Sequence, residues 1–173
     1  MAGRIGHEKS YRLLPALLDR LTDDSREEPD DKPATGKAPL YRAIMRDLTW
    51  LLNSTQPLDA SANTCPLVED SVLNYGLPPL AGRPASQVDT TVLAAAIEKA
   101  IKRFEPRILA ETLQVRVIED AGILDSHNVI GLEIRGHVWA QPQPIEVQFR
   151  TQLDLETGKV EIKDLGAGAS RMS

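Results

Sequence analysis

The first third of the chain contains two stretches in which apolar side chains recur every three or four residues. Over residues 10–21 the spacing is i, i+3, i+4 and i+7, with Leu14, Leu17, Leu18 and Leu21. Over residues 40–54 one face carries Tyr41, Ile44, Leu48, Leu51 and Leu52, and the opposite face carries Arg42, Arg46 and Asp47. Such spacing aligns the apolar side chains along one side of an α-helix. Both stretches are therefore predicted to form amphipathic helices.

A third helix is predicted over residues 90–104. Its core-facing positions are Leu93, Ile97, Ala100, Ile101 and Phe104. Asp89 precedes it and is a residue type favoured at the N-cap, because its carboxylate accepts hydrogen bonds from the first turn. Pro106 disfavours helical geometry at Glu105, so the helix is expected to end there.

From residue 112 onward the period of the pattern shortens to two. The apolar phase runs through three segments and contains Leu113, Val115, Val117, Ile130, Leu132, Ile134, Val138, Ile145, Val147, Phe149, Thr151, Leu153 and Leu155. Strict alternation is typical of antiparallel strands with one face in water. A turn at 156–159 then leads into a return strand that begins with Val160 and Ile162. The predicted fold class is α+β: N-terminal helices followed by a four-stranded antiparallel meander packed on the helices.

Residues 22–38 separate the first two predicted helices and differ from both in composition. They contain six acidic and three basic side chains, two prolines and no large apolar residue. A segment that buries so little apolar surface does not offset its ordering entropy, so it is expected to be a flexible acidic linker. The expected organisation is an N-terminal helical arm (1–21), this linker (22–38), one domain (39–165) and a frayed tail (166–173). Within the domain, residues 55–69 are interpreted as a connection and 71–82 as an ordered loop.

Composition excludes several classes of function. The chain has 20 Lys and Arg against 25 Asp and Glu, for a net charge of −5, and it lacks the basic stripe that nucleic-acid binding requires. Cys65 is the only cysteine, so neither an intrachain disulfide nor a cysteine-based zinc site is expected. No apolar run is long enough to span a membrane. The chain is expected to be soluble and cytoplasmic.

Motifs for catalysis or metal binding are also missing from the sequence. His7, His127 and His137 do not have metal-ligand spacing, and no nucleophile elbow or phosphate-binding glycine loop is present. A glycosidase would need two carboxylates about 5–10 Å apart, one of them protonated. The nearest candidates are Glu105, Glu111, Glu119 and Asp120. Basic neighbours of Glu105 favour its charged form, the opposite of what a general acid needs.

Two local features are more specific. The loop SVLNYGLPPLAG places Gly76, Pro78, Pro79 and Gly82 within twelve positions. The step Phe104-Glu105-Pro106-Arg107 is expected to leave Glu105 and Arg107 displayed at a helix C-terminus, where Arg107 can bind orphan carbonyls or a carboxylate. Two interpretations stay open at this point, an internal cap with a salt bridge and a docking contact for another protein.

At these motifs the sequence resembles a known family. It resembles the TssE-type baseplate subunits of the bacterial type VI secretion system, at LLPALLDRL, SVLNYGLPPLAG and FEPR. These subunits belong to a contractile-tail phage baseplate wedge family that is often labelled lysozyme-like. The resemblance extends from about residue 10 to residue 164. It implies a structural, non-enzymatic subunit of the cytoplasmic baseplate docked at the inner membrane. The implied partners are the TssF and TssG wedge proteins, TssK and the TssB/TssC sheath.

The resemblance also implies which residues make protein contacts. They are Glu105, Pro106 and Arg107 of the family's Glu-Pro-Arg motif, Tyr75, Gly76, Leu77 and Pro78 of the loop, and Leu14, Leu17 and Leu18 of the arm. Pro79 departs from the family pattern, which often has an acidic residue there. Edge strands of the meander are expected to template sheath assembly by pairing with another chain. No catalytic, cofactor or metal site, small-molecule substrate, nucleic acid or membrane insertion is expected. The alternative function is a peptidoglycan muramidase, as the family label suggests.

Overall fold

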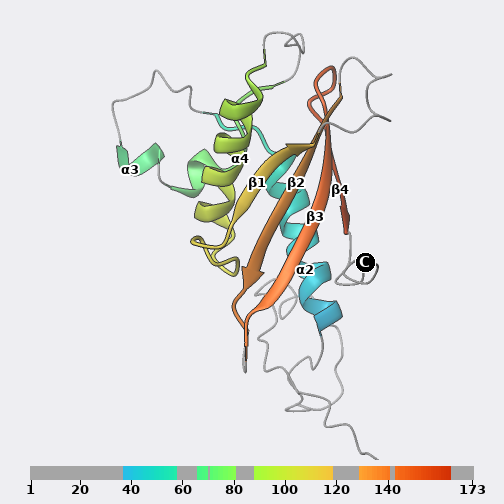
Figure 1. The fold of residues 1–173 in the computed structure, drawn as a ribbon. Coiled ribbons are helices and arrows are strands. Elements are labelled where there is room, and N and C mark those ends of the chain that lie inside the picture. Colours follow the sequence, from blue (N-terminus) through green and yellow to red (C-terminus); the bar gives the residue numbers. More distant parts are fainter. Residues whose placement is uncertain are drawn as a thin grey trace, which may run out of the picture.

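The computed structural model describes residues 37–57, 66–69, 71–80, 88–118, 129–140 and 143–164. Their elements, in chain order, are α2 (Lys37–Leu52), α3 (Pro66–Glu69), the 3-10 helix η1 (Val72–Asn74), α4 (Thr90–Phe104), β1 (Gln114–Ile118), β2 (Val129–Val138), β3 (Ile145–Asp154) and β4 (Val160–Asp164) (Figure 1). The predicted arm (1–21), most of the linker and the tail lie outside the described residues.

Helix α2 confirms the second amphipathic prediction. Its apolar face is buried at Tyr41, Ile44, Leu48, Leu51 and Leu52. The helix begins at Lys37, three residues before the expected start at 40. The hydrogen-bond pattern of α2 continues to Asn53, whose N–H donates to Thr49 O at 3.2 Å. The Ser54 hydroxyl then donates to Trp50 O at 2.7 Å, which satisfies a carbonyl of the last turn.

Helix α4 has the two boundaries that the sequence predicts. At its start, the Asp89 carboxylate accepts from the N–H groups of Thr91 at 2.8 Å and Val92 at 3.2 Å. At its end, the last helical residue is Phe104. Asp89 is exposed, so its contribution comes from this cap and not from packing.

Replacing Asp89 with alanine is expected to lower the free energy of unfolding by about 1 kcal/mol, since two N–H groups of the first turn lose their acceptor. Thermal unfolding of the Asp89→Ala and Asp89→Asn variants measures the effect. The asparagine variant keeps an acceptor oxygen and should retain most of the stability. Equal losses for both variants would show that the cap contributes nothing.

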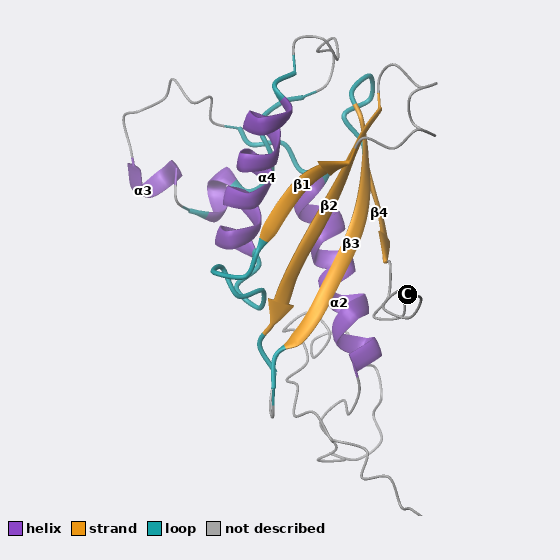
Figure 2. Ribbon diagram, viewed as in Figure 1, coloured by secondary structure: helices purple, strands orange, loops and turns teal. Residues whose placement is uncertain are grey.

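The strands form one antiparallel sheet in the order β1-β2-β3-β4, which is the predicted meander. β2 and β3 pair along their whole length, from Val129 opposite Asp154 to Val138 opposite Ile145. One face of the sheet is covered by α2 and α4 (Figures 1 and 2). The α+β class, with the helices preceding the strands, is confirmed.

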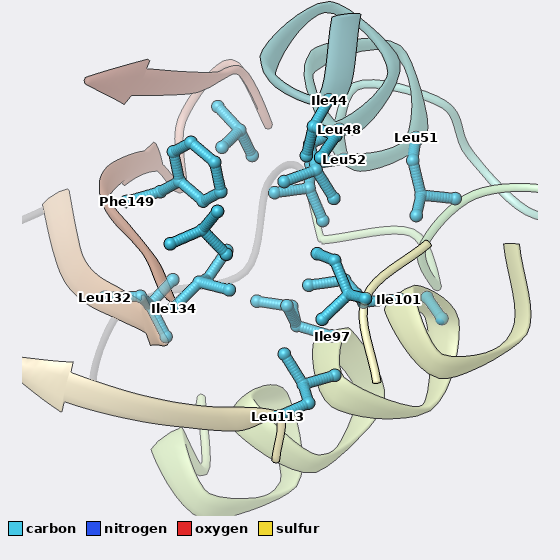
Figure 3. Packing of buried hydrophobic residues seen from close by; sticks show 14 of the residues in the cluster. Ile44, Leu48, Leu51, Leu52, Ile97, Ile101, Leu113, Leu132, Ile134 and Phe149 are labelled. Atoms are coloured by element: carbon cyan, nitrogen blue, oxygen red, sulfur yellow. The ribbon is translucent and has the colours of Figure 1, made fainter. Parts of the chain in front are cut away.

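The core lies between that sheet face and the two helices. Figure 3 shows Leu132, Ile134 and Phe149 of the sheet directed toward Ile44 and Leu48 of α2 and Ile97 and Ile101 of α4. The alternating burial along β3 matches the predicted apolar phase and includes Thr151. On the other face lie polar side chains such as Arg135, Gln148 and Arg150. Within the described ranges, no helix has the length and apolar character needed to cross a membrane.

Candidate functional site

The Glu-Pro-Arg motif lies where α4 ends and the chain turns toward the sheet. The Ile108 N–H donates to Glu105 O at 3.1 Å across a turn that contains Pro106. Proline favours this turn because its ring fixes φ and disfavours helical geometry at the preceding residue. The chain then runs antiparallel to the end of β2, where the Trp139 N–H donates to Arg107 O at 3.0 Å. The Arg107 backbone is therefore positioned by both the helix end and the sheet.

The Arg107 side chain joins three elements through its guanidinium. Nε donates to Glu105 Oε1 at 2.6 Å, and Nη2 donates to Glu105 Oε2, so the planar fork binds both carboxylate oxygens. Nη2 also donates to Asp47 Oδ2 at 2.5 Å, and Asp47 belongs to α2. One cation thus ties the end of α4, the turn after it and the middle of α2 together.

The polar face of α2 continues this cluster. Asp47 Oδ1 accepts from Arg46 Nε at 2.9 Å. The Arg46 guanidinium lies 5.3 Å from the ring centroid of Trp50, which is half exposed. This distance is in the range of a cation–π contact. Arginine and tryptophan are also the side chains most often found at energetically important protein contacts.

Burial separates the two charged residues of the motif. Glu105 is only 3% exposed, whereas the Arg107 side chain is 28% exposed. The expectation that both would be displayed is therefore wrong for Glu105, because the turn at Pro106 folds its carboxylate back under Arg107. The hydrogen bonds from Arg107 to Glu105 are the main cause that raises the pKa of the guanidinium, and Asp47 adds to it against the effect of partial burial. The internal salt bridge that the sequence left open is present.

Tyr75 packs against the other side of the helix end. Its ring meets that of Phe104 edge-on, with centroids 5.1 Å apart and an interplanar angle of 66°. Its hydroxyl donates to Asp47 O across 3.5 Å, a long contact. Partial burial raises the pKa of the Tyr75 phenol, and the negative charges of Asp47 and Glu105 raise it further. The Tyr75 phenol therefore stays protonated and uncharged beside the ion pair.

The rest of the loop motif has mainly an internal role. Gly76 has φ 119°, and a Cβ there would lie 2.3 Å from Ser54 O, so only glycine fits. The Leu77 N–H donates to Ser54 O at 2.8 Å, which pairs the loop with the segment after α2, and the Leu77 side chain is buried. Pro78 and Pro79 are both exposed.

The structure thus brings together Tyr75, Glu105 and Arg107, with Pro106 shaping the turn between the last two. Gly76 and Leu77 hold the loop against the end of α2, while Pro78 remains at the surface. The interaction role of all these residues stays a prediction. Leu14, Leu17 and Leu18 lie outside the described residues.

Sequence reasoning missed Asp47 as a site residue. The sequence places Asp47 on the polar face of its helix. No local pattern signals a partner sixty positions away. The only available signal was its place on that face next to Arg46. Phe104 was assigned to the core, and it does pack there while also contacting Tyr75.

The cluster is an ion pair between Arg107, Glu105 and Asp47. Both oxygens of Glu105 accept hydrogen bonds from Arg107, which leaves neither oriented to carry a proton to a substrate. Across the part of the chain that the structure describes, no group of three His, Cys, Asp or Glu side chains could hold a metal ion. A positioned arginine at a surface flanked by aromatic side chains is suited to bind a carboxylate or carbonyl of another protein.

The fold defines the class as an α+β domain with two helices on one face of an antiparallel sheet. The sequence matches the family of the baseplate wedge protein gp25 over residues 39–143, more than half of the chain, and the chain therefore belongs to that family. The matched stretch runs from α2 through β2 and contains Asp47, Tyr75, Glu105 and Arg107. Comparisons with curated proteins and with solved structures gave no match. The resemblance found in the sequence is confirmed at the level of the family, whose role is that of a structural baseplate component.

Proposed function

We propose that this chain is the TssE-type subunit of a type VI secretion baseplate. It binds the wedge proteins TssF and TssG, together with TssK, in the cytoplasmic baseplate at the inner membrane. It connects that platform to the TssB/TssC contractile sheath, whose assembly it templates through an edge strand. Membership of the baseplate wedge family supports the baseplate role, and the local geometry supports the contacts.

The observation that carries the proposed wedge contact is that the Arg107 guanidinium is held in place by two carboxylates and keeps further hydrogen-bond donors. Nε and Nη2 are engaged by Glu105 and Asp47, which hold the group in one orientation. Nη1 makes no hydrogen bond to any described residue, and the side chain is 28% exposed. Its two N–H donors therefore belong to a positioned and partly exposed guanidinium. A guanidinium already fixed in place loses little entropy on binding, so an acceptor on a wedge protein gains a preorganised partner.

The proposed sheath contact rests on the sheet. β1 and β4 are its two outer strands, and each has one side without a strand neighbour among the described residues. An outer strand presents main-chain N–H and C=O groups to which another chain can add a strand.

A non-enzymatic role also fits the site better than the muramidase alternative. A muramidase requires a desolvated acid whose proton is available to the glycosidic oxygen. Glu105 is desolvated, but its oxygens are bound by Arg107 and linked through it to Asp47. Of the two candidate carboxylates that the structure describes, Glu111 is exposed, and the buried one, Glu105, is thus committed to an internal ion pair.

The test is co-purification of the chain with TssF and TssG, comparing wild type with Arg107→Lys. A lysine ammonium can still lie between Glu105 and Asp47 and preserve the internal charge pairing, but it lacks the outward Nη1 donors. We expect the wild-type complex to form and the Arg107→Lys variant to bind at least about tenfold more weakly, a loss of about 1.4 kcal/mol.

Arg135→Lys is the matched control, because Arg135 also pairs with a carboxylate, that of Glu133, but lies on the polar sheet face away from the site. It should bind like wild type. Wild-type affinity for Arg107→Lys would place the wedge contact elsewhere. Failure of the wild-type chain to bind TssF and TssG would overturn the proposed function.

A further inference from the structure

The side chain of Asn53 is bound to the edge of β4. Its Nδ2 donates to Val160 O at 2.9 Å, and its Oδ1 accepts from the Val160 N–H at 3.0 Å. An amide side chain carries one donor group and one acceptor, so here it takes the place that a residue of a neighbouring strand would occupy. The same Nδ2 also donates to Thr49 O at 2.8 Å, which anchors the amide to the last turn of α2.

The orientation of β4 shows which of its backbone groups lie at the free edge. Lys159 O accepts from the Asp154 N–H at 2.9 Å, so the Lys159 carbonyl points toward β3. In an antiparallel pair the direction of the backbone groups alternates along each strand. The groups of Val160 and Ile162 therefore point away from β3. Asn53 occupies the first of these positions, and the next one along the edge is Ile162.

The segment after Asn53 lies next to the turn that precedes β4. Ser54 and Thr55 pair with Leu77, through the bond from the Leu77 N–H to Ser54 O and a parallel bridge between Thr55 and Leu77. These segments and the turn between β3 and β4 enclose a cleft of about 250 Å³ that Asn53 also lines. On the N-terminal side of Val160, the outer edge of β4 therefore lies beside the end of α2 and this cleft.

The side chains of β4 describe the strand that would fit beside it. Val160 and Ile162 face the core, and Ile162 is only partly buried. Glu161 and Lys163 are exposed on the opposite face. Cross-strand neighbours of opposite charge stabilise a pair, whereas like charges destabilise it. A fitting segment is therefore extended, with apolar side chains that continue the core face and charges complementary to Glu161 and Lys163.

We propose that Asn53 is a pairing stop on the outer edge of β4. An extended segment of a partner chain pairs with this edge from Ile162 toward the end of the strand and is halted at Val160. Because the backbone groups of Val160 and Ile162 point in the same direction, the stop does not change which face of the added strand joins the core, and it sets where pairing with β4 begins. This inference rests on the proposed function, in which the sheath supplies that segment.

Residue-resolved amide hydrogen exchange tests the stop, first in the free chain and then in complex with purified TssB/TssC. In the free wild-type chain, Val160 should exchange at least about tenfold more slowly than Ile162, because among the described residues only Val160 has an edge acceptor. In the complex, Ile162 should gain protection while Val160 changes little.

In Asn53→Ala, Val160 should exchange at least about tenfold faster in the free chain, and the partner should then protect it as well. The matched control is Ser54→Ala. It also removes a side-chain bond to the last turn of α2 but leaves β4 untouched, so it should behave as wild type.

Two results would overturn the pairing stop while leaving the proposed function in place. One is unchanged Val160 exchange in Asn53→Ala. The other is a complex in which protection appears at β1, at Val115 and Val117, instead of at Ile162. Failure of the wild-type chain to bind TssB/TssC would overturn both the stop and the proposed sheath contact.

Discussion

Replacing Arg107 with alanine is expected to lower the free energy of unfolding by about 2 kcal/mol, which is large for a partly exposed side chain. The variant removes both guanidinium donors from Glu105, which is 3% exposed, and leaves its carboxylate only the backbone N–H of residue 107, 3.3 Å from Oε1. A buried carboxylate without a partner costs more than the ion pair contributes, because desolvation of the charge is no longer offset. Partial exposure of Arg107 keeps the effect below that of a fully buried pair. Urea unfolding of the Arg107→Ala variant measures it.

The double variant Glu105→Leu/Arg107→Leu is the control for this interpretation. It removes both charges together, so no buried carboxylate remains unpaired, and its stability should lie within about 1 kcal/mol of wild type. If the double variant were as unstable as Arg107→Ala, the loss would come from the packing of Arg107 and not from the orphaned charge. In the wedge co-purification, the double variant should be folded and yet fail to bind, since it lacks the Nη1 donors.

Gly76→Ala is expected to destabilise the chain by about 3 kcal/mol. The new Cβ would lie 2.3 Å from Ser54 O, and the backbone there has φ 119°, which side-chain-bearing residues rarely adopt. Relieving that contact requires Leu77 to move away from Ser54, which breaks their hydrogen bond and withdraws a buried leucine from the core. Thermal or urea unfolding measures the loss.

Gly158→Ala serves as the comparison for Gly76. Gly158 also has a positive φ, of 71°, but that value lies in the left-handed helical region. Its replacement should cost about 1 kcal/mol. Similar losses at the two glycines would mean that backbone conformation alone accounts for the requirement at Gly76, and that its close approach to Ser54 does not matter.

Regular elements were predictable because their signals lie within a few residues of one another. The boundaries of α4 follow from Asp89 and Pro106, and the phase of β3 follows from its alternation, which the burial pattern reproduces. The order of the strands also followed, since a turn signal between alternating segments predicts that consecutive strands pair. In each case the physical cause, a cap or a repeat period, acts over less than one turn or hairpin.

Only the part of the candidate site whose residues lie close together in the sequence was predictable. Glu105 and Arg107 are two residues apart, so a salt bridge between them could be foreseen as one of two interpretations. The burial of Glu105 could not, because it depends on how the turn at Pro106 lies against α2. The proposed contact roles of Pro106, Tyr75 and the loop came from the family resemblance and not from their contacts in the structure.

By itself, the sequence determined α2, α4 and the four strands of an α+β chain, and it identified the baseplate wedge family. The third predicted helix, in the arm, lies outside the described residues. Only the tertiary structure decided which side chains meet across elements. Arg107 binds Asp47 sixty positions away, and Asn53 binds Val160 at a separation of 107. Such pairs arise from the crossing of α2 over the sheet and over α4, which side-chain packing sets. A hydropathy period shows which face of a helix is buried, but it carries no information on what that helix lies beside.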